Sequence, residues 1–174
     1  MSDRQLLTLE PMAGDPEVGR WLAAMEDCRR DTLREIDGVT DAMLDVVPAG
    51  SDNSIAALLY HIALIEADWL LADVFLLEDA RSAEPALLPF VDRDVDGHLT
   101  TVEGGSLAEH LARLTAIRSI LLDRLRPMPA SDFHFPRRRE RYDVAPDWVV
   151  HHLLQHEAEH RSEIARIKRD LLRA

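Results

Sequence analysis

Apolar residues recur every three or four positions in four long stretches of the chain, which is the pattern of amphipathic helices. These stretches cover about residues 16–36, 54–76, 106–125 and 144–171. Asp15, Ser54 and Ser106 stand before the first three, where their side chains can accept hydrogen bonds from the free N–H groups of a first helical turn. No segment of useful length alternates between apolar and polar residues as a half-buried strand would. The pattern therefore predicts an all-α fold, a four-helix bundle.

The connection between the second and third predicted helices is unusually long. Residues 81–105 carry two prolines and three glycines, too many helix-breaking residues for another long helix. We expect a long crossover connection here. The length of the chain is typical of one domain, so we expect residues 1–174 to form a single domain.

Composition narrows the range of partners. The chain has 32 acidic and 20 basic side chains, a formal net charge of −12, and this field disfavours nucleic acids and anionic membrane surfaces. The longest apolar stretch is interrupted by Glu66, Asp68 and Asp73, so we expect no bilayer-spanning segment. The single Cys28 and a start without a basic and then apolar leader favour the reducing cytoplasm. We expect the protein to be cytoplasmic, to form a homodimer and to act on a small molecule.

Histidines replace apolar residues on the inward stripes of two predicted helices. His156 and His160 lie four residues apart on the last helix, close enough to share one ion, and His61 lies on the inward stripe of the second. A buried imidazole nitrogen without a partner costs free energy, and a divalent metal bound by these three residues would remove that cost. Three protein ligands leave at least one position open on the ion, which is typical of a reactive site.

Residues His156 to His160 also spell H-E-x-x-H, the zinc-protease motif. That motif requires a third ligand downstream and a sheet edge that holds the peptide. Few residues follow His160, and Glu163 and Arg166 stand where the extended motif has glycine and histidine. The sequence therefore disfavours a peptidase.

Polar neighbours could orient the imidazole rings, as metal-bound histidines generally require. The candidates are Glu66, His152, Gln155 and Glu157. A packing or solvent-exposed role is equally compatible with the sequence for each of them. Glu157 could also be the base of a metal-dependent hydrolase, although it lies about 100° around the helix from His156.

Two segments of the chain resemble the DinB/YfiT-like superfamily of small helical bundles. One is SIAALLYHIA at residues 54–63, followed by Glu66 and Trp69, and the other is WVVHHLLQHEAEHR at residues 148–161. The layout of four helices with a long second connection fits the same family. The chain departs from the family after His160, where the family often has H-R-G-Q and this sequence has HRSE.

The resemblance implies both ligands and chemistry. In the family one histidine on the second helix and two on the fourth bind a divalent metal, which corresponds to His61, His156 and His160 here. Three imidazole ligands accept zinc, nickel, iron or manganese, and of these zinc or nickel is the ion we expect. Characterised relatives include metal-dependent transferases and isomerases that use low-molecular-weight thiols such as mycothiol or bacillithiol, which implies transfer of such a thiol to a small electrophile. The alternative is a non-catalytic, metal-stabilised bundle that binds a ligand or a partner.

Two further patterns carry possible chemistry. Residues Asp92–Glu103 match the calcium-loop pattern D-x-D-x-D-G-x5-E, but prolines and glycines stand where its flanking helices belong, which favours a simple Asp-Gly turn. The run Arg137–Arg141 concentrates positive charge shortly before the last helix. It could attract an anionic substrate, although such a run is more often a solvated loop.

Overall fold

The structure, a computed structural model, describes residue 4 and residues 6–77 and 79–173. The long helices are α1 (Pro16–Ile36), α3 (Ile55–Asp68), α5 (Leu107–Leu125) and α7 (Pro146–Leu171). The short elements are helices α2 (Asp41–Leu44), α4 (Ala80–Ala83) and α6 (Ala130–Phe133), the π-helix η1 (Trp69–Val74) and the strands β1 (Arg137–Arg138) and β2 (Asp143–Val144). The protein is mostly helical, which confirms the all-α prediction.

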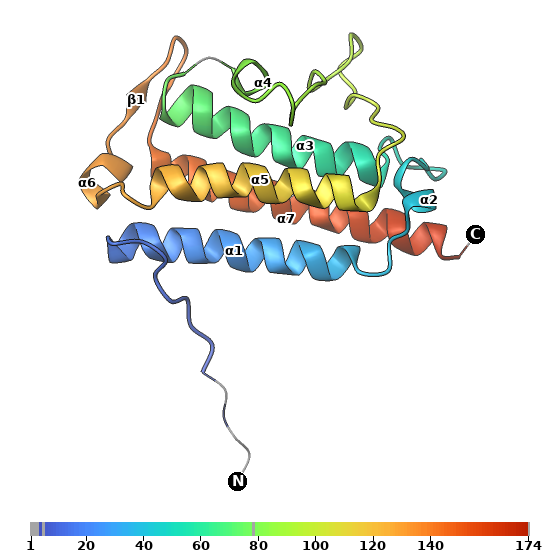
Figure 1. The fold of residues 1–174 in the computed structure, drawn as a ribbon, viewed down its shortest axis with the longest axis horizontal. Coiled ribbons are helices and arrows are strands. Elements are labelled where there is room, and N and C mark those ends of the chain that lie inside the picture. Colours follow the sequence, from blue (N-terminus) through green and yellow to red (C-terminus); the bar gives the residue numbers. More distant parts are fainter. Residues whose placement is uncertain (1–3, 5, 78, 174) are drawn as a thin grey trace.

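The four long helices lie side by side along most of their length (Figure 1). α1 and α7 run in one direction, while α3 and α5 run together in the other. Parallel neighbours cannot be joined by a short turn, so the chain between η1 and α5 must travel back along the helices. The crossover that the sequence predicts between the second and third long helices is this segment.

Local sequence explains where the first and third long helices begin. The Asp15 carboxylate accepts hydrogen bonds from the N–H groups of Glu17 and Val18 at the start of α1. Ser106 and Glu109 form a reciprocal capping box at the start of α5. These helices therefore have nearly the bounds that the sequence predicts.

The second and fourth helices depart from prediction at one end. We expected a regular helix through Leu76, but α3 ends at Asp68 and continues as η1, and Leu76 is 52% exposed at a backbone φ of 54°. The wider turn of a π-helix rotates the following residues around the axis, so the 3.6-residue pattern no longer identifies the inward positions. Val144, expected near the start of the last helix, instead belongs to β2, which pairs with β1 in an antiparallel hairpin.

The interior explains the high hydropathy of the second helix. Residues Ile55–Val74 are long and apolar enough, by length and composition, to cross a membrane, which the expectation of no bilayer-spanning segment overlooked. In this fold 78% of an 18-residue apolar window of that segment is buried inside the protein, where it packs against the other long helices. The segment thus forms the central helix of the core.

A tyrosine on α3 fastens the crossover to the bundle. The buried Tyr60 hydroxyl donates a hydrogen bond to the Phe90 carbonyl oxygen at 2.7 Å and accepts one from the Phe90 N–H at 2.8 Å. The two rings also pack edge to face, with centroids 5.5 Å apart. This attachment brings the next residues of the crossover, including Asp92, over the following residue of α3, His61.

Candidate metal centre

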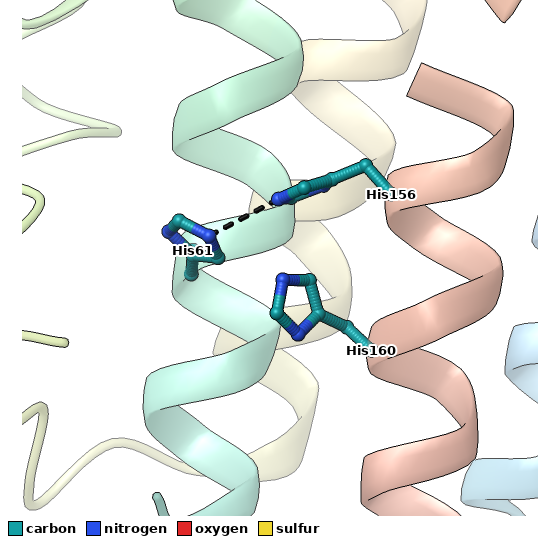
Figure 2. Close-up of side chains that lie close together, drawn as sticks. All are labelled: His61, His156 and His160. Carbon is teal, nitrogen blue, oxygen red and sulfur yellow. Dashed lines mark hydrogen bonds between the residues drawn. The ribbon is translucent and has the colours of Figure 1, made fainter. Parts of the chain in front are cut away.

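Three histidines from two helices converge in the structure. His61 comes from α3, and His156 and His160 come from consecutive turns of α7 (Figure 2). One ring nitrogen from each lies within 4.8 Å of the other two, and His61 Nε2 and His156 Nε2 are 3.1 Å apart. His61 is buried, while the other two are partly exposed. The fold therefore brings the three predicted ligands together.

The spacing of these nitrogens suits a single ion. Tetrahedral zinc with zinc–nitrogen bonds of about 2.0–2.1 Å holds its ligand nitrogens about 3.3 Å apart. The His61–His156 separation already has this value within a few tenths of an ångström. His160 closes the set after a shift of at most about 1.5 Å, which side-chain rotation can supply.

A carboxylate from the crossover orients the buried ligand. Asp92 Oδ1 lies 2.6 Å from His61 Nδ1. The hydrogen bond from His61 lowers the pKa of Asp92, so the carboxylate is ionised and acts only as an acceptor. When Nδ1–H of a neutral His61 ring donates to this carboxylate, the lone pair of Nε2 faces His156 and His160. Carboxylate–histidine pairs of this kind fix the ring and raise its basicity as a metal ligand.

A second carboxylate stands behind His160. Glu163 Oε2 lies 3.4 Å from His160 Nδ1, one turn further along α7. The other oxygen of Glu163 accepts a hydrogen bond of 2.9 Å from Asn53, which precedes α3. This is the position at which the sequence departs from the DinB-like pattern, and the glutamate there supplies charge to the centre.

Electrostatics keep the α7 histidines neutral. Burial lowers the pKa of His156 to about 3, and the neighbouring His160 and His61 rings contribute to the same direction. Burial, followed by the His61 ring, also lowers the pKa of His160. Neutral imidazole is the form that binds a metal ion, so this cluster is prepared for a cation without first losing a proton at neutral pH.

The four residues that were candidates for orienting the imidazole rings make other contacts. Gln155 is exposed, and His152 lies against aromatic rings, stacked on Trp148 with ring centroids 5.2 Å apart and an interplanar angle of 10°. Glu66 and Glu157 are buried and bind arginines. The hydrolase alternative, in which Glu157 serves as the base, is therefore wrong in this respect, because both of its oxygens are occupied by guanidinium groups.

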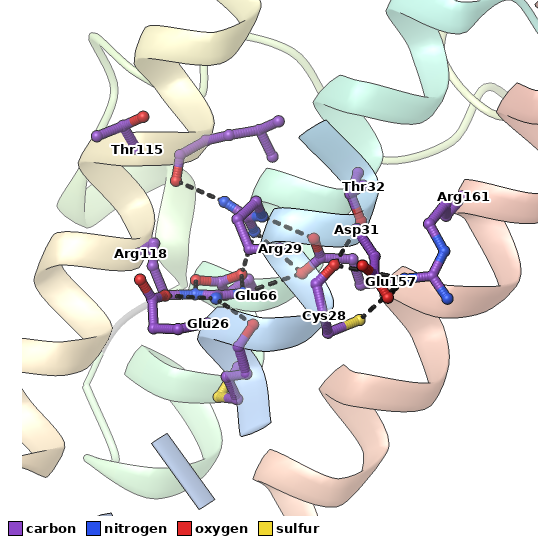
Figure 3. Close-up of polar contacts among 12 residues, drawn as sticks. Glu26, Cys28, Arg29, Asp31, Thr32, Glu66, Thr115, Arg118, Glu157 and Arg161 are labelled. Carbon is purple, nitrogen blue, oxygen red and sulfur yellow. Dashed lines mark hydrogen bonds and ion pairs between the residues drawn. The ribbon is translucent and has the colours of Figure 1, made fainter. Parts of the chain in front are cut away.

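These guanidinium groups belong to a buried ionic network that joins all four long helices (Figure 3). Arg29 of α1 donates to Glu157 of α7 at 2.7 Å and to Glu66 of α3 at 2.8 Å. Arg118 of α5 donates to both oxygens of Glu66, to Glu157 and to the more exposed Glu26. Arg29, Glu66, Arg118 and Glu157 are each at most 6% exposed.

The network is balanced enough to remain charged in the core. Burial alone would raise the pKa of Glu157, but Arg29 and Arg118 outweigh it and lower the pKa. Burial would likewise lower the pKa of Arg118, and the Glu66 and Glu157 carboxylates outweigh it and raise the pKa. Paired charges with saturated hydrogen bonds are the form in which ions persist in a protein interior.

Sequence reasoning missed the contact of Asp92 with His61 and the two buried arginines. The signal for the network was present, because each of its four buried members follows an inward apolar residue by one helical turn, in the pairs Met25–Arg29, Ile62–Glu66, Leu114–Arg118 and Leu153–Glu157. Charged residues at inward positions of every helix indicate mutual pairing. Asp92 had no comparable signal, since it lies on an irregular loop far from His61 in the sequence.

The two remaining patterns take defined conformations. Asp92, the first position of the calcium-loop pattern, contacts His61 and Arg93 and has a side chain that is 34% exposed, while Asp94 accepts hydrogen bonds from the N–H groups of Asp96 and His98 in its own turn. The expected Asp-Gly turn is thus present. The expectation that its carboxylates are merely solvated is corrected at Asp92, which is paired with His61 and Arg93.

Within the basic run, two arginines are tied to neighbouring structure. Arg137 pairs with Asp132, and Arg139 pairs with the buried Asp73 of η1. Arg138 and Arg141 are exposed. Only these last two are thus available to attract an anionic substrate.

Two comparisons with known proteins complement this description. The family model described as the DinB superfamily matches residues 24–164, which include all three histidines and the whole ionic network. No curated protein matches the chain.

Proposed function

The chain belongs to the DinB superfamily, and on this basis we propose that it is a metal-dependent transferase that joins a low-molecular-weight thiol, of the mycothiol or bacillithiol type, to a small electrophile. The observation that carries the proposal is the convergence of His61, His156 and His160 on one point, with one ring nitrogen of each within 4.8 Å. We also propose that the chain forms a single four-helix bundle with a long crossover. We propose in addition that it is a cytoplasmic homodimer that binds neither nucleic acid nor membranes.

The residues around the three histidines support a reactive centre. Three neutral imidazoles leave the full charge of a divalent ion uncompensated and at least one coordination position free. His156 and His160 are partly exposed, so a small molecule can approach from the α7 side. Asp92 and Glu163 hold two of the rings from behind and adjust the charge of the centre.

A divalent ion, for which zinc or nickel suits three imidazole ligands, would supply a charge that holds a thiol as its anion at neutral pH. With such an ion held by His61, His156 and His160, the thiol would lose its proton to solvent, and its sulfur would bond to a carbon atom of the electrophile while the leaving group departs with the bonding electron pair. The protein contributes orientation, through the carboxylates behind the rings, and a partly desolvated surrounding that strengthens the electrostatic interactions.

The alternative role, a bundle that the metal merely stabilises, has less support. The buried ionic network already ties α1, α3, α5 and α7 to one another through side chains that do not belong to the metal centre. We therefore expect the metal-free protein to stay folded, which a purely structural ion would not allow.

Metal content by elemental mass spectrometry tests the centre. Untagged wild-type protein is expected to contain about one equivalent of metal, and His61→Ala and His156→Ala are expected to contain little. His151→Ala is the matched control, because His151 is an exposed histidine on the same helix as His156. Metal retained by both ligand variants, or absent from wild type after titration with zinc and nickel, would contradict the assignment.

Activity requires a second assay. Metal-loaded protein is incubated with a low-molecular-weight thiol and a panel of small electrophiles, and loss of free thiol is followed together with formation of the thioether. The proposal predicts consumption that His156→Ala abolishes and His151→Ala does not. A folded, metal-loaded protein that consumes no thiol with any member of the panel would favour the non-catalytic alternative.

A further inference from the structure

An aromatic cavity lies beside the metal centre at the π-helix end of the bundle. Its volume is about 480 Å³, within the range of small-molecule sites. We call it the aromatic slot, and its walls include Trp69, Pro136, Tyr142, Val144, Ala145 and Trp148.

Three of the nine Phe, Trp and Tyr residues of the chain line the slot. The chain has three tryptophans and two tyrosines, and two tryptophans and one tyrosine line this cavity. The Trp69 ring lies 5.4 Å from that of Trp148 and 6.3 Å from that of Tyr142, measured between centroids. Trp148 is nevertheless 49% exposed and Tyr142 47% exposed. Large aromatic rings held together in a partly open cavity are typical of a binding site.

Separate elements hold these rings in place. Trp69 opens η1, and π-helical turns are rare and occur frequently at functional sites. The Tyr142 hydroxyl donates a hydrogen bond of 2.8 Å to the buried Asp73 of the same π-helix, and Arg139 pairs with the same carboxylate at 3.1 Å. The β1–β2 hairpin is thereby fastened to η1, with the Tyr142 hydroxyl already bonded and its ring left available to the slot.

The slot is linked to the candidate metal centre by a row of neighbouring side chains on α7. Trp148, His152, His156 and His160 follow one another at four-residue spacing along one face of α7. His152 stacks on Trp148, packs edge to face with Trp69 at 4.9 Å between centroids, and lies 6.1 Å from the His156 ring. A small molecule in the slot would therefore be separated from the metal ligands by a single imidazole.

We infer that the aromatic slot binds a planar, uncharged, apolar group of the electrophilic substrate, such as an aromatic or conjugated ring. This inference rests on the proposed function for the identity of the ligand as a substrate. The lining favours it, because indole and phenol faces stack on flat rings. The charged residue in the lining is the acidic Asp143, which disfavours an anionic ring.

Equilibrium dialysis with 2-naphthol tests the slot without any catalytic readout. The saturated decahydro-2-naphthol is the comparison for planarity, and 2-naphthoate is the comparison for charge. Trp148→Ala is expected to weaken 2-naphthol binding at least about tenfold, and Trp148→Phe only about two- to threefold, because phenylalanine keeps a flat face. Trp21→Phe, at the tryptophan on α1 outside the slot, is expected to leave binding unchanged. Decahydro-2-naphthol and 2-naphthoate should bind at least about fivefold more weakly than 2-naphthol.

Three results would overturn the inference. They are no 2-naphthol binding up to about 1 mM, equal binding of the saturated alcohol, or equal losses in Trp148→Ala and Trp21→Phe. A shift of wild-type but not Trp148→Ala protein to a dimer in size-exclusion chromatography, without 2-naphthol binding, would instead assign the cavity to a second copy of the chain. His156→Ala separates the two proposals, because it removes a metal ligand but should retain 2-naphthol binding. If wild-type protein binds 2-naphthol through Trp148 but transfers no thiol, the slot stands and the proposed transferase function fails.

Discussion

The contact between Asp92 and His61 makes the sharpest prediction about metal affinity. The two side chains meet at 2.6 Å, and the His61 side chain is 5% exposed while that of Asp92 is 34% exposed. A hydrogen bond to a charged group contributes about 1.5–3 kcal/mol. Since about 1.4 kcal/mol corresponds to a factor of ten, Asp92→Ala should weaken metal binding about 10- to 100-fold.

Two substitutions at Asp92 separate charge from hydrogen bonding. Asparagine retains an oxygen that can accept a hydrogen bond from Nδ1–H but removes the negative charge. The loss of metal affinity in Asp92→Asn should therefore lie at the lower end of the range. Asp92→Ala removes both and should lie at the upper end. Asp96→Asn is the matched control, because Asp96 is an exposed carboxylate of the same loop, and it should bind metal like wild type.

The assay is competition for zinc against a chromophoric chelator at constant pH and salt concentration. Circular dichroism of each metal-free variant checks that the fold is intact, and a thermal melt checks that Asp92→Ala has not loosened the crossover. If Asp92→Ala binds zinc within about twofold of wild type while remaining folded, the carboxylate does not act on the metal through His61.

Other predictions concern stability. Arg118→Met leaves Glu66 and Glu157 with fewer partners in the core and should lower the free energy of unfolding, measured by urea titration, by about 3–5 kcal/mol. Arg34→Met removes an exposed ion pair and should lower the free energy of unfolding by less than about 1 kcal/mol. Equal effects of the two substitutions would contradict the importance of the network. His134 bridges Asp147 and Glu17 at the starts of α7 and α1. The Asp147 hydrogen bond is the largest influence and raises the pKa of His134 above 6.5, burial opposes it, and the Glu17 hydrogen bond adds to the rise. A raised pKa stabilises the fold below pH 6.5, and that stability is lost as pH rises through the folded-state pKa. Urea titrations of wild type from pH 6 to 9 should therefore show a decline in the free energy of unfolding that His134→Gln lacks. The same decline in both proteins would refute His134 as its origin. Removal of metal with a chelator should leave the helical circular dichroism signal unchanged, and its collapse would favour a structural ion.

The order of the polar and apolar residues determined the bounds of two long helices and the placement of the three histidines. Helix-capping side chains and the apolar stripes were sufficient to predict α1 and α5 with nearly their observed bounds, because such signals act within one or two turns. The three histidines could be predicted for the same reason, since helical periodicity alone places His156 and His160 on one face of α7.

Local signals failed where the outcome depends on contacts distant in sequence. The π-helix after Asp68 replaces a regular turn, and sequence periodicity assumes a constant number of residues per turn. Glu157 follows His156 directly, yet the packing of α1 and α5 against α7 directs its carboxylate to Arg29 and Arg118 rather than to the metal centre.

Only the tertiary structure decided which groups surround the three histidines. Asp92 reaches His61 because Tyr60 fastens the crossover through Phe90, a contact between segments about 30 residues apart. The aromatic slot likewise forms only when the β1–β2 hairpin docks on η1. Helical periodicity thus determines which face a ligand occupies, whereas the path of irregular chain over that face determines its charge, its orientation and the space beside it.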